Sequence, residues 1–174
     1  MPPLLVVVLL AAPAPAARPA EGGRARDGIE QRREAIAREI IAIGAQIRRE
    51  IEGHDVAGLL ARVPQEGLRC ADRVVPRERV ARDLLDERSW VHGVLFGGPG
   101  YGPPPGTAAS LAALFRSARE VALAVSFEPD PRAGPDGRPC LAFRSRESGT
   151  PGSPLCFERR QDRWWLVESL YPCG

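Results

Sequence analysis

The longest periodic stretch of the chain is residues 29–53, IEQRREAIAREIIAIGAQIRREIEG. Its isoleucines recur mostly three or four positions apart, with arginine and glutamate between them. Side chains at this spacing share one face of a helix, so the stretch predicts an amphipathic helix that ends at Gly53. Its charged face includes pairs at i and i+4, such as Glu34 with Arg38, and is expected to be solvated.

Short elements are predicted between this helix and the last third of the chain. Capping residues and a well-placed proline favour helices at residues 55–62, 76–85 and 110–118. The sequence WVHGVLF predicts a strand over residues 90–96, and residues 66–70 predict a shorter one. Residues 97–106, GGPGYGPPPG, predict a long surface loop or lid, because their prolines remove the backbone donors that a phosphate-binding loop needs.

The last third of the chain predicts an antiparallel sheet. The final two strands are expected to join at a turn near Gln161 and Asp162, and the strand patterns cover residues 120–127, 140–144, 154–159 and 163–171. Helices come first and strands follow, so the predicted fold class is α+β, in one domain over residues 28–174.

Two adjacent tryptophans, Trp164 and Trp165, lie in the last predicted strand. Neighbouring strand residues point to opposite faces of a sheet, and both faces of this strand are largely apolar. A strand with one solvated face alternates more cleanly. We therefore expect one tryptophan in the core, and the other under a second layer, a ligand or a partner subunit.

The first residues predict a secretion signal. Residues 4–12, LLVVVLLAA, form a short apolar run followed by small residues and prolines. This order is typical of a signal peptide, predicted at residues 1–20, with a flexible polar linker at 21–27; the alternative is a disordered tail. Because a stable membrane span takes about 20 apolar residues, none is expected in the mature chain. We expect an exported protein, periplasmic or extracellular.

The four cysteines fit an oxidising compartment. They are even in number and widely spaced, without the close pairs of zinc or thioredoxin-like sites, and they are Cys70, Cys140, Cys156 and Cys173. Four cysteines allow three pairings. We favour Cys140–Cys156, since both are expected on neighbouring strands, which leaves Cys70–Cys173.

The sequence contains few motifs that indicate catalysis or cofactor binding. The two histidines, His54 and His92, lack metal-site spacing, so no metal or cofactor is expected. A net charge of +2 does not indicate a nucleic-acid partner. If the protein is an enzyme, the candidates are His92 or Asp83 as general base and Tyr101 on a lid.

The order of elements resembles the nuclear transport factor 2-like (SnoaL-like, cystatin-related cone) superfamily. The resemblance covers about residues 28–173 and uses the long first helix, D-x-x-x-L-L at residues 55–60, and a W-x-L/V pattern in the last strand. It implies helices packed on a curved, cone-like sheet with a pocket between them. The cysteines and the insertion at residues 97–106 depart from the family pattern. Members include isomerases, cyclases, dehydratases and non-catalytic modules, so the function stays open.

The first hypothesis is a disulfide-stabilised, non-catalytic protein that binds a small apolar ligand or a protein partner. The partner surface would be the outer sheet face, in a homodimer or a complex with another protein. The residues expected to line a ligand pocket are Trp90, Trp164, Trp165 and Tyr171. The alternatives are a cyclase- or isomerase-type enzyme and a structural envelope or secretion-accessory module.

Overall fold

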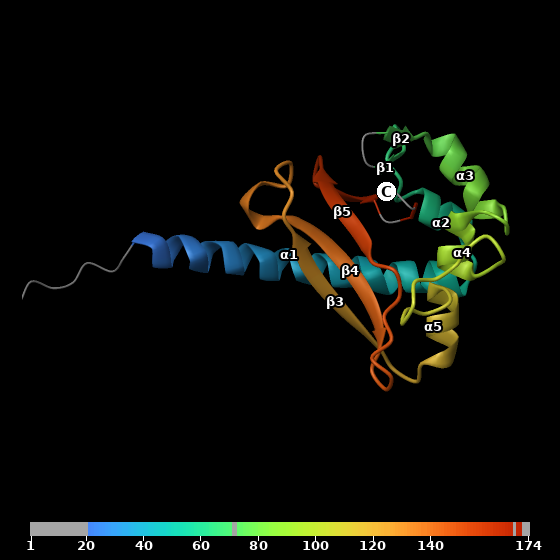
Figure 1. Ribbon diagram of the computed structural model, residues 1–174. Coiled ribbons are helices and arrows are strands. Elements are labelled where there is room, and N and C mark those ends of the chain that lie inside the picture. Colours follow the sequence, from blue (N-terminus) through green and yellow to red (C-terminus); the bar gives the residue numbers. More distant parts are fainter. Residues whose placement is uncertain (1–20, 71–72, 169, 172–174) are drawn as a thin grey trace, which may run out of the picture.

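The computed structural model describes residues 21–70, 73–168 and 170–171. The helices are α1 (Glu21–Glu52), α2 (Val56–Leu60), α3 (Arg77–Leu85), α4 (Trp90–Phe96), α5 (Leu111–Ser117) and the 3-10 helix η1 (Gly134–Asp136). The strands are β1 (Leu68–Cys70), β2 (Arg73–Val75), β3 (Val121–Glu128), β4 (Arg138–Ser145), β5 (Leu155–Arg160) and β6 (Arg163–Glu168). Helices α2 to α5 gather at one end of α1, and the first turns of α1 project beyond the sheet (Figure 1).

The long helix α1 carries the apolar stripe that its isoleucines predict. Ile40, Ile47 and Ile51 are at most 2% exposed and face the core. Between them, Gly44 allows the helix to approach the sheet closely. The helix begins at Glu21, so it includes residues 21–27, which the sequence predicted as a linker. Once nucleated, a helix extends at little cost, and the arginines and alanine of this segment are good helix formers.

The main sheet is antiparallel with the strand order β3-β4-β5-β6, which confirms the predicted α+β class. β3 and β4 pair over their full lengths, from Val121↔Ser145 to Glu128↔Arg138. β5 and β6 join at Gln161 and Asp162, as predicted. Both residues have positive φ, which matches the primed turns that suit the twist of a hairpin. The cone-like packing stays a prediction.

Helix α4 corrects the strand predicted over residues 90–96. Ser89 caps the helix, because its hydroxyl oxygen accepts a hydrogen bond from the backbone N–H of His92 at 3.0 Å. Residues 91–95 are all buried, so this helix has no solvated face that would show the helical period in the sequence. A short apolar run of this kind fits either element, and its alternation was therefore misleading.

The predicted disulfide Cys140–Cys156 is confirmed, and it joins directly opposed residues of β4 and β5. The predicted Cys70–Cys173 pairing involves Cys173, which lies outside the described residues and leaves the pairing a prediction. The predicted signal peptide at residues 1–20 also lies outside them. No helix in the described part of the chain is long and apolar enough to cross a membrane.

The space between α1 to α4 and the sheet is filled by side chains. A cavity there has a volume of only about 10 Å³, and its walls are Ile47, Leu59, Arg62, Val63, Leu84, Leu95, Leu155, Leu166 and Leu170. A single water molecule needs at least about 10–15 Å³. The described residues therefore leave no room for a ligand in this cavity, where the family resemblance implies a pocket.

Candidate binding groove

The three candidate catalytic residues are bonded to different parts of the fold. The ring of His92 is buried, and its Nδ1 lies 2.9 Å from the carbonyl oxygen of Leu84. The hydroxyl of Tyr101 lies 3.1 Å from Ser153 Oγ. Asp83 pairs with Arg79, whose Nε lies 3.0 Å away. In the described part of the chain, none of these three candidates hydrogen-bonds to another, so the structure does not assemble them into an acid–base site.

Asp83 also accepts a hydrogen bond from the hydroxyl of Tyr171 at 2.8 Å. Burial raises the pKa of the Tyr171 phenol above its ordinary value, and the hydrogen bond to the Asp83 carboxylate raises it further. The phenol is therefore protonated at neutral pH and acts as a donor. This pair connects the end of the chain to α3 and serves the fold.

The histidines and cysteines do not form a metal site among the described residues. His54 stacks on Phe96 with ring centroids 4.0 Å apart, and its centroid lies 5.5 Å from that of His92. One triple of potential ligand atoms, from Glu128, Cys140 and Cys156, lies within 4.8 Å. Its two sulfurs are joined in a disulfide, and a metal needs the thiolate form.

The four aromatic residues expected at a ligand pocket lie in different places. Trp90 packs edge-on against Tyr101, with ring centroids 4.8 Å apart. Trp164 faces α1 and packs against the core, whereas Trp165 points to the other sheet face beneath Arg163, whose guanidinium carbon lies 4.3 Å from the ring centroid. Tyr171 contacts α3. Trp164 is therefore the tryptophan on the core side of the strand.

Trp164 lines a groove of about 430 Å³, which we call the α1 groove. It is lined by residues of α1, of the loop that joins β3 to β4, and of strands β4, β5 and β6. Its lining residues are Arg32, Ala35, Ile36, Glu39, Arg132, Ala133, Asp136, Gly137, Pro139, Phe157, Glu158, Arg159 and Trp164. The groove combines an apolar floor with charged walls.

Contacts between distant parts of the chain hold the walls in place. The indole N–H of Trp164 donates to Glu39 Oε2 at 2.7 Å, and these residues are 125 positions apart. Arg32 Nε lies 3.1 Å from both carboxylate oxygens of Asp136, and Arg33 Nε donates to the Asp136 carbonyl at 2.8 Å. These bonds fix the β3–β4 loop and the β6 strand against the same helix.

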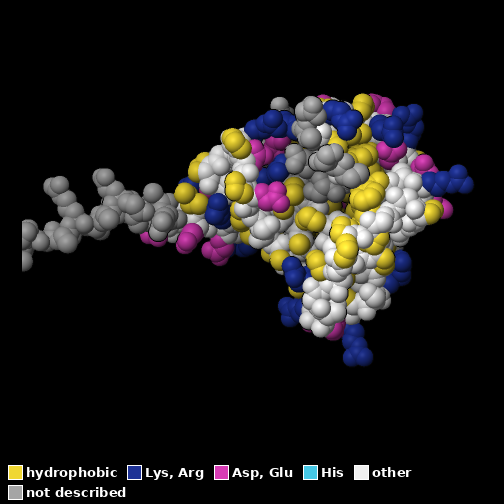
Figure 2. Space-filling view, viewed as in Figure 1, with side chains coloured by type: hydrophobic (Ala, Val, Ile, Leu, Met, Phe, Trp, Pro, Cys, Tyr) yellow, Lys and Arg dark blue, Asp and Glu magenta, His cyan; other side chains and the backbone are white. Residues whose placement is uncertain are grey.

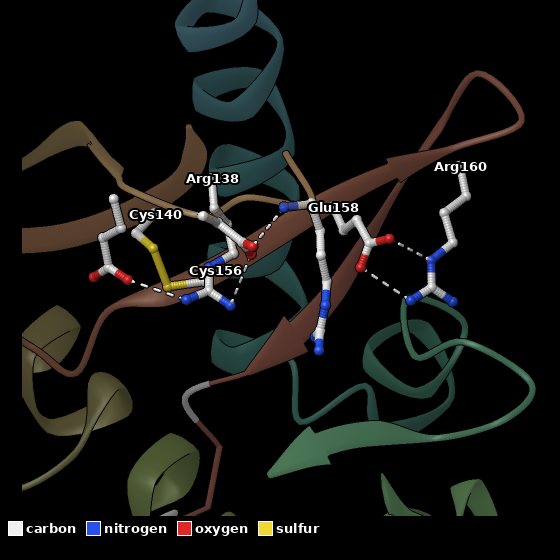
Figure 3. Close-up of polar contacts among 8 residues, drawn as sticks. Arg138, Cys140, Cys156, Glu158 and Arg160 are labelled. Carbon is white, nitrogen blue, oxygen red and sulfur yellow. Dashed lines mark hydrogen bonds and ion pairs between the residues drawn. A yellow bond between two sulfur atoms is a disulfide. The ribbon is translucent and has the colours of Figure 1, made fainter. Parts of the chain in front are cut away.

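The carboxylates of the groove all have partners within the protein. Asp136 pairs with Arg32, and Glu39 accepts from Trp164. The side chain of Glu158 lies on the Trp165 face of the sheet, where its carboxylate accepts two hydrogen bonds from Arg160 at 3.0 Å, as Figure 3 shows. The exposed guanidinium of Arg132 differs from them, because it has no hydrogen-bond or ion-pair partner among the described residues.

The outer face of the sheet, expected to bind a partner, carries paired charges. Arg138 pairs with Glu128 at 3.3 Å and with Asp130 at 3.6 Å, beside the Cys140–Cys156 disulfide (Figure 3). Figure 2 shows basic and acidic side chains intermixed with small and hydrophobic ones on the viewed face. Large unpaired apolar patches mark interaction sites more often than mixed surfaces do. The α1 groove is the stronger candidate site.

The sequence did not indicate this groove. Residues 128–137, EPDPRAGPDG, were predicted only to end a strand, and the charges of α1 were predicted to be solvated. The ion pair Arg32–Asp136 corrects part of that expectation. The signal that was present is the apolar character of the Trp164 face of the strand, which indicated a second covered surface.

Comparison with known proteins finds no matching family model, no matching curated protein and no matching solved structure. The resemblance to the nuclear transport factor 2-like superfamily is therefore still a prediction.

Proposed function

We propose that the protein is a non-catalytic binding protein that holds a segment of a partner polypeptide in the α1 groove. The observation that supports this is the lining of the α1 groove, a hollow of about 430 Å³, whereas the cavity between the helices and the sheet holds only about 10 Å³. The groove has a tryptophan, an apolar floor and arginines at its edge. Protein interfaces are enriched in tryptophan and arginine, with an apolar centre and a polar rim.

The other functions predicted from the sequence have less support. A small apolar ligand favours an enclosed apolar pocket, and the cavity that the described residues form between α1 to α4 and the sheet holds only about 10 Å³. An acid–base enzyme needs its groups in mutual reach, and His92, Asp83 and Tyr101 each bond elsewhere. Export to the periplasm or the extracellular space is part of the proposal, and the Cys140–Cys156 disulfide supports it because such bonds persist in oxidising compartments.

The test uses a displayed library of random linear peptides, selected on the immobilised, purified protein. Peptides that are enriched over an uncoated support are then measured by fluorescence polarisation against two variants of α1. Ala35 lines the groove, so Ala35→Trp should fill part of it and weaken binding at least about tenfold, the loss expected when a buried hot-spot contact is blocked.

The matched control places the same large side chain elsewhere on the same helix. Ala45 is exposed and does not line the groove, so Ala45→Trp should leave binding within about twofold. Circular dichroism checks that both variants fold. The proposal fails if no peptide is enriched, or if the enriched peptides bind Ala35→Trp as tightly as the original protein.

A further inference from the structure

We propose that the segment held in the α1 groove presents a side-chain carboxylate, of aspartate or glutamate, to Arg132, beside an apolar side chain that packs on Trp164 and Ile36. This inference rests on the proposed function and names the chemistry of the partner. It comes from the hydrogen-bonding capacity that remains in the groove once the contacts within the protein have formed.

The acceptors of the groove are already engaged. Both carboxylate oxygens of Asp136 lie 3.1 Å from Arg32 Nε, and the Glu158 carboxylate lies on the opposite face of the sheet, bonded to Arg160. Glu39 accepts from the indole of Trp164 at 2.7 Å. A basic segment would compete with Arg32 and with the Trp164 indole for these carboxylates. The groove therefore disfavours lysine and arginine in its partner.

The donors of the groove are less fully engaged. Arg132 offers a complete guanidinium, which binds a carboxylate with two parallel hydrogen bonds. Arg159 lies 3.7 Å from both Glu39 and Asp162, which is too long for a hydrogen bond, and its side chain is 46% exposed. Arg132 can therefore donate to a further carboxylate without loss of an existing contact, whereas Arg159 is ion-paired with Glu39 and Asp162 and lies 5.7 Å from the Trp164 ring centroid.

The position of Arg132 is set by an ordered turn. Asp130 Oδ1 accepts from the backbone N–H of Arg132 at 2.9 Å, and the carbonyl oxygen of Asp130 accepts from the N–H of Ala133 at 3.0 Å. A few residues later, Asp136 ties the same loop to α1. Because the loop is held at both points, the backbone that carries Arg132 needs little reordering when a partner binds.

The floor of the groove determines what accompanies the carboxylate. Ile36 and Trp164 are partly buried against the core, so the rest of their apolar surface lies open beside the charged wall, above the fully buried Phe157. Aromatic and aliphatic groups in such a setting supply most of the binding energy, while the charge supplies specificity and register. An acidic residue next to an apolar one matches both parts of the groove.

The experiment uses peptides selected on the original protein and asks whether an acidic residue of each peptide is coupled to Arg132. Replacing that residue by its amide should weaken binding about five- to tenfold, the range for a charged hydrogen bond at a partly exposed site. The same replacement should change the affinity for the Arg132→Gln variant by less than about twofold, because this variant lacks the positive charge that would pair with the carboxylate. Arg119→Gln is the control, since Arg119 is exposed and far from the groove lining.

The outcomes separate this inference from the proposed function. Suppose that Ala35→Trp weakens binding of the peptides, but that the amide replacement weakens binding to the original protein and to the Arg132→Gln variant by the same factor. The carboxylate inference is then overturned, and the proposed function of the groove stands. If the selected peptides are basic or carry no acidic residue, it is overturned as well. If the peptides bind the Ala35→Trp variant as tightly as the original protein, the proposed function is overturned, and the inference is overturned with it.

Discussion

Replacing Gly44 with alanine tests whether α1 packs on the sheet as closely as the structure shows. A methyl group at this position would lie 2.5 Å from Leu141 Cδ2 and 2.8 Å from Leu123 Cδ2. Both distances are shorter than the contacts that a Cβ atom makes in folded proteins. Leu141 is fully buried between the helix and the neighbouring strands, so it has little freedom to move aside.

Two opposing effects set the magnitude. Alanine is a better helix former than glycine by about 1 kcal/mol in a helix interior. Overpacking a well-filled core costs about 1–3 kcal/mol. We therefore expect Gly44→Ala to change the free energy of unfolding by between nothing and a loss of about 2 kcal/mol, whereas the same change at an uncrowded position would be stabilising.

Gly28 provides the matched control on the same helix. The nearest atom to a Cβ at Gly28 is Arg32 Nη1 at 3.7 Å, which is an ordinary contact. Gly28→Ala should therefore gain up to about 1 kcal/mol, with the lower part of that range expected near a fraying helix end. With a gain of about 0.5 kcal/mol at Gly28, the two variants should differ by about 0.5–2.5 kcal/mol.

Urea unfolding followed by circular dichroism measures the free energy of unfolding of both variants. In thermal unfolding, the same difference corresponds to about 2–4 °C per kcal/mol for a chain of this size. If Gly44→Ala stabilises the protein as much as Gly28→Ala, then no leucine side chains press on position 44. That result would refute the packing of α1 against β3 and β4 on which the α1 groove depends.

Three further predictions concern other supports of the fold. Replacing both Cys140 and Cys156 with alanine should lower the free energy of unfolding by about 3 kcal/mol, because their disulfide closes a loop with a sequence separation of 16; an unchanged urea midpoint would contradict this. Because the folded protein raises the pKa of Tyr171, the stability that this group contributes is present below its ordinary pKa of 10.0 and is lost as the pH rises above it. In urea titrations above pH 10.0, the free energy of unfolding of Tyr171→Phe should therefore fall less than that of the original protein. If both free energies fall equally with pH, the raised pKa of Tyr171 is contradicted. Ser110 caps α5 by accepting from the N–H of Ala113 at 3.0 Å, so Ser110→Ala should lower the free energy of unfolding by about 1 kcal/mol; an unchanged free energy of unfolding would exclude the cap.

The elements that the sequence predicted well are those whose signals are local. The isoleucine period of α1 extends over many turns, and the turn at Gln161 and Asp162 separates two strongly apolar strands. Residues 90–96 show the opposite case, because their pattern is short and every residue from 91 to 95 is buried. A pattern without a solvated face carries no information about the period of the element.

The candidate site escaped prediction for a different reason. Its walls meet through Arg32 and Asp136, which are 104 positions apart, and through Glu39 and Trp164. Arg32, Glu39 and Asp136 are ordinary in their own segments, since charged side chains on a helix or in a loop are usually solvated. Only the fold of the whole chain brings them together, and sequence patterns within one segment do not predict contacts between distant segments.

The two adjacent tryptophans have different roles, and the geometry of the strand requires this. Trp164 faces α1, where its indole N–H bonds to Glu39 and its ring forms part of the groove. Trp165 points to the other face of the sheet and lies under the guanidinium of Arg163. Because side chains on a strand alternate between faces, a segment bound in the α1 groove can contact Trp164 and is separated from Trp165 by the sheet itself. A partner that contacted both rings would have to wrap around the edge of β6. Trp164 therefore serves the groove, whereas Trp165 is covered by the side chain of Arg163.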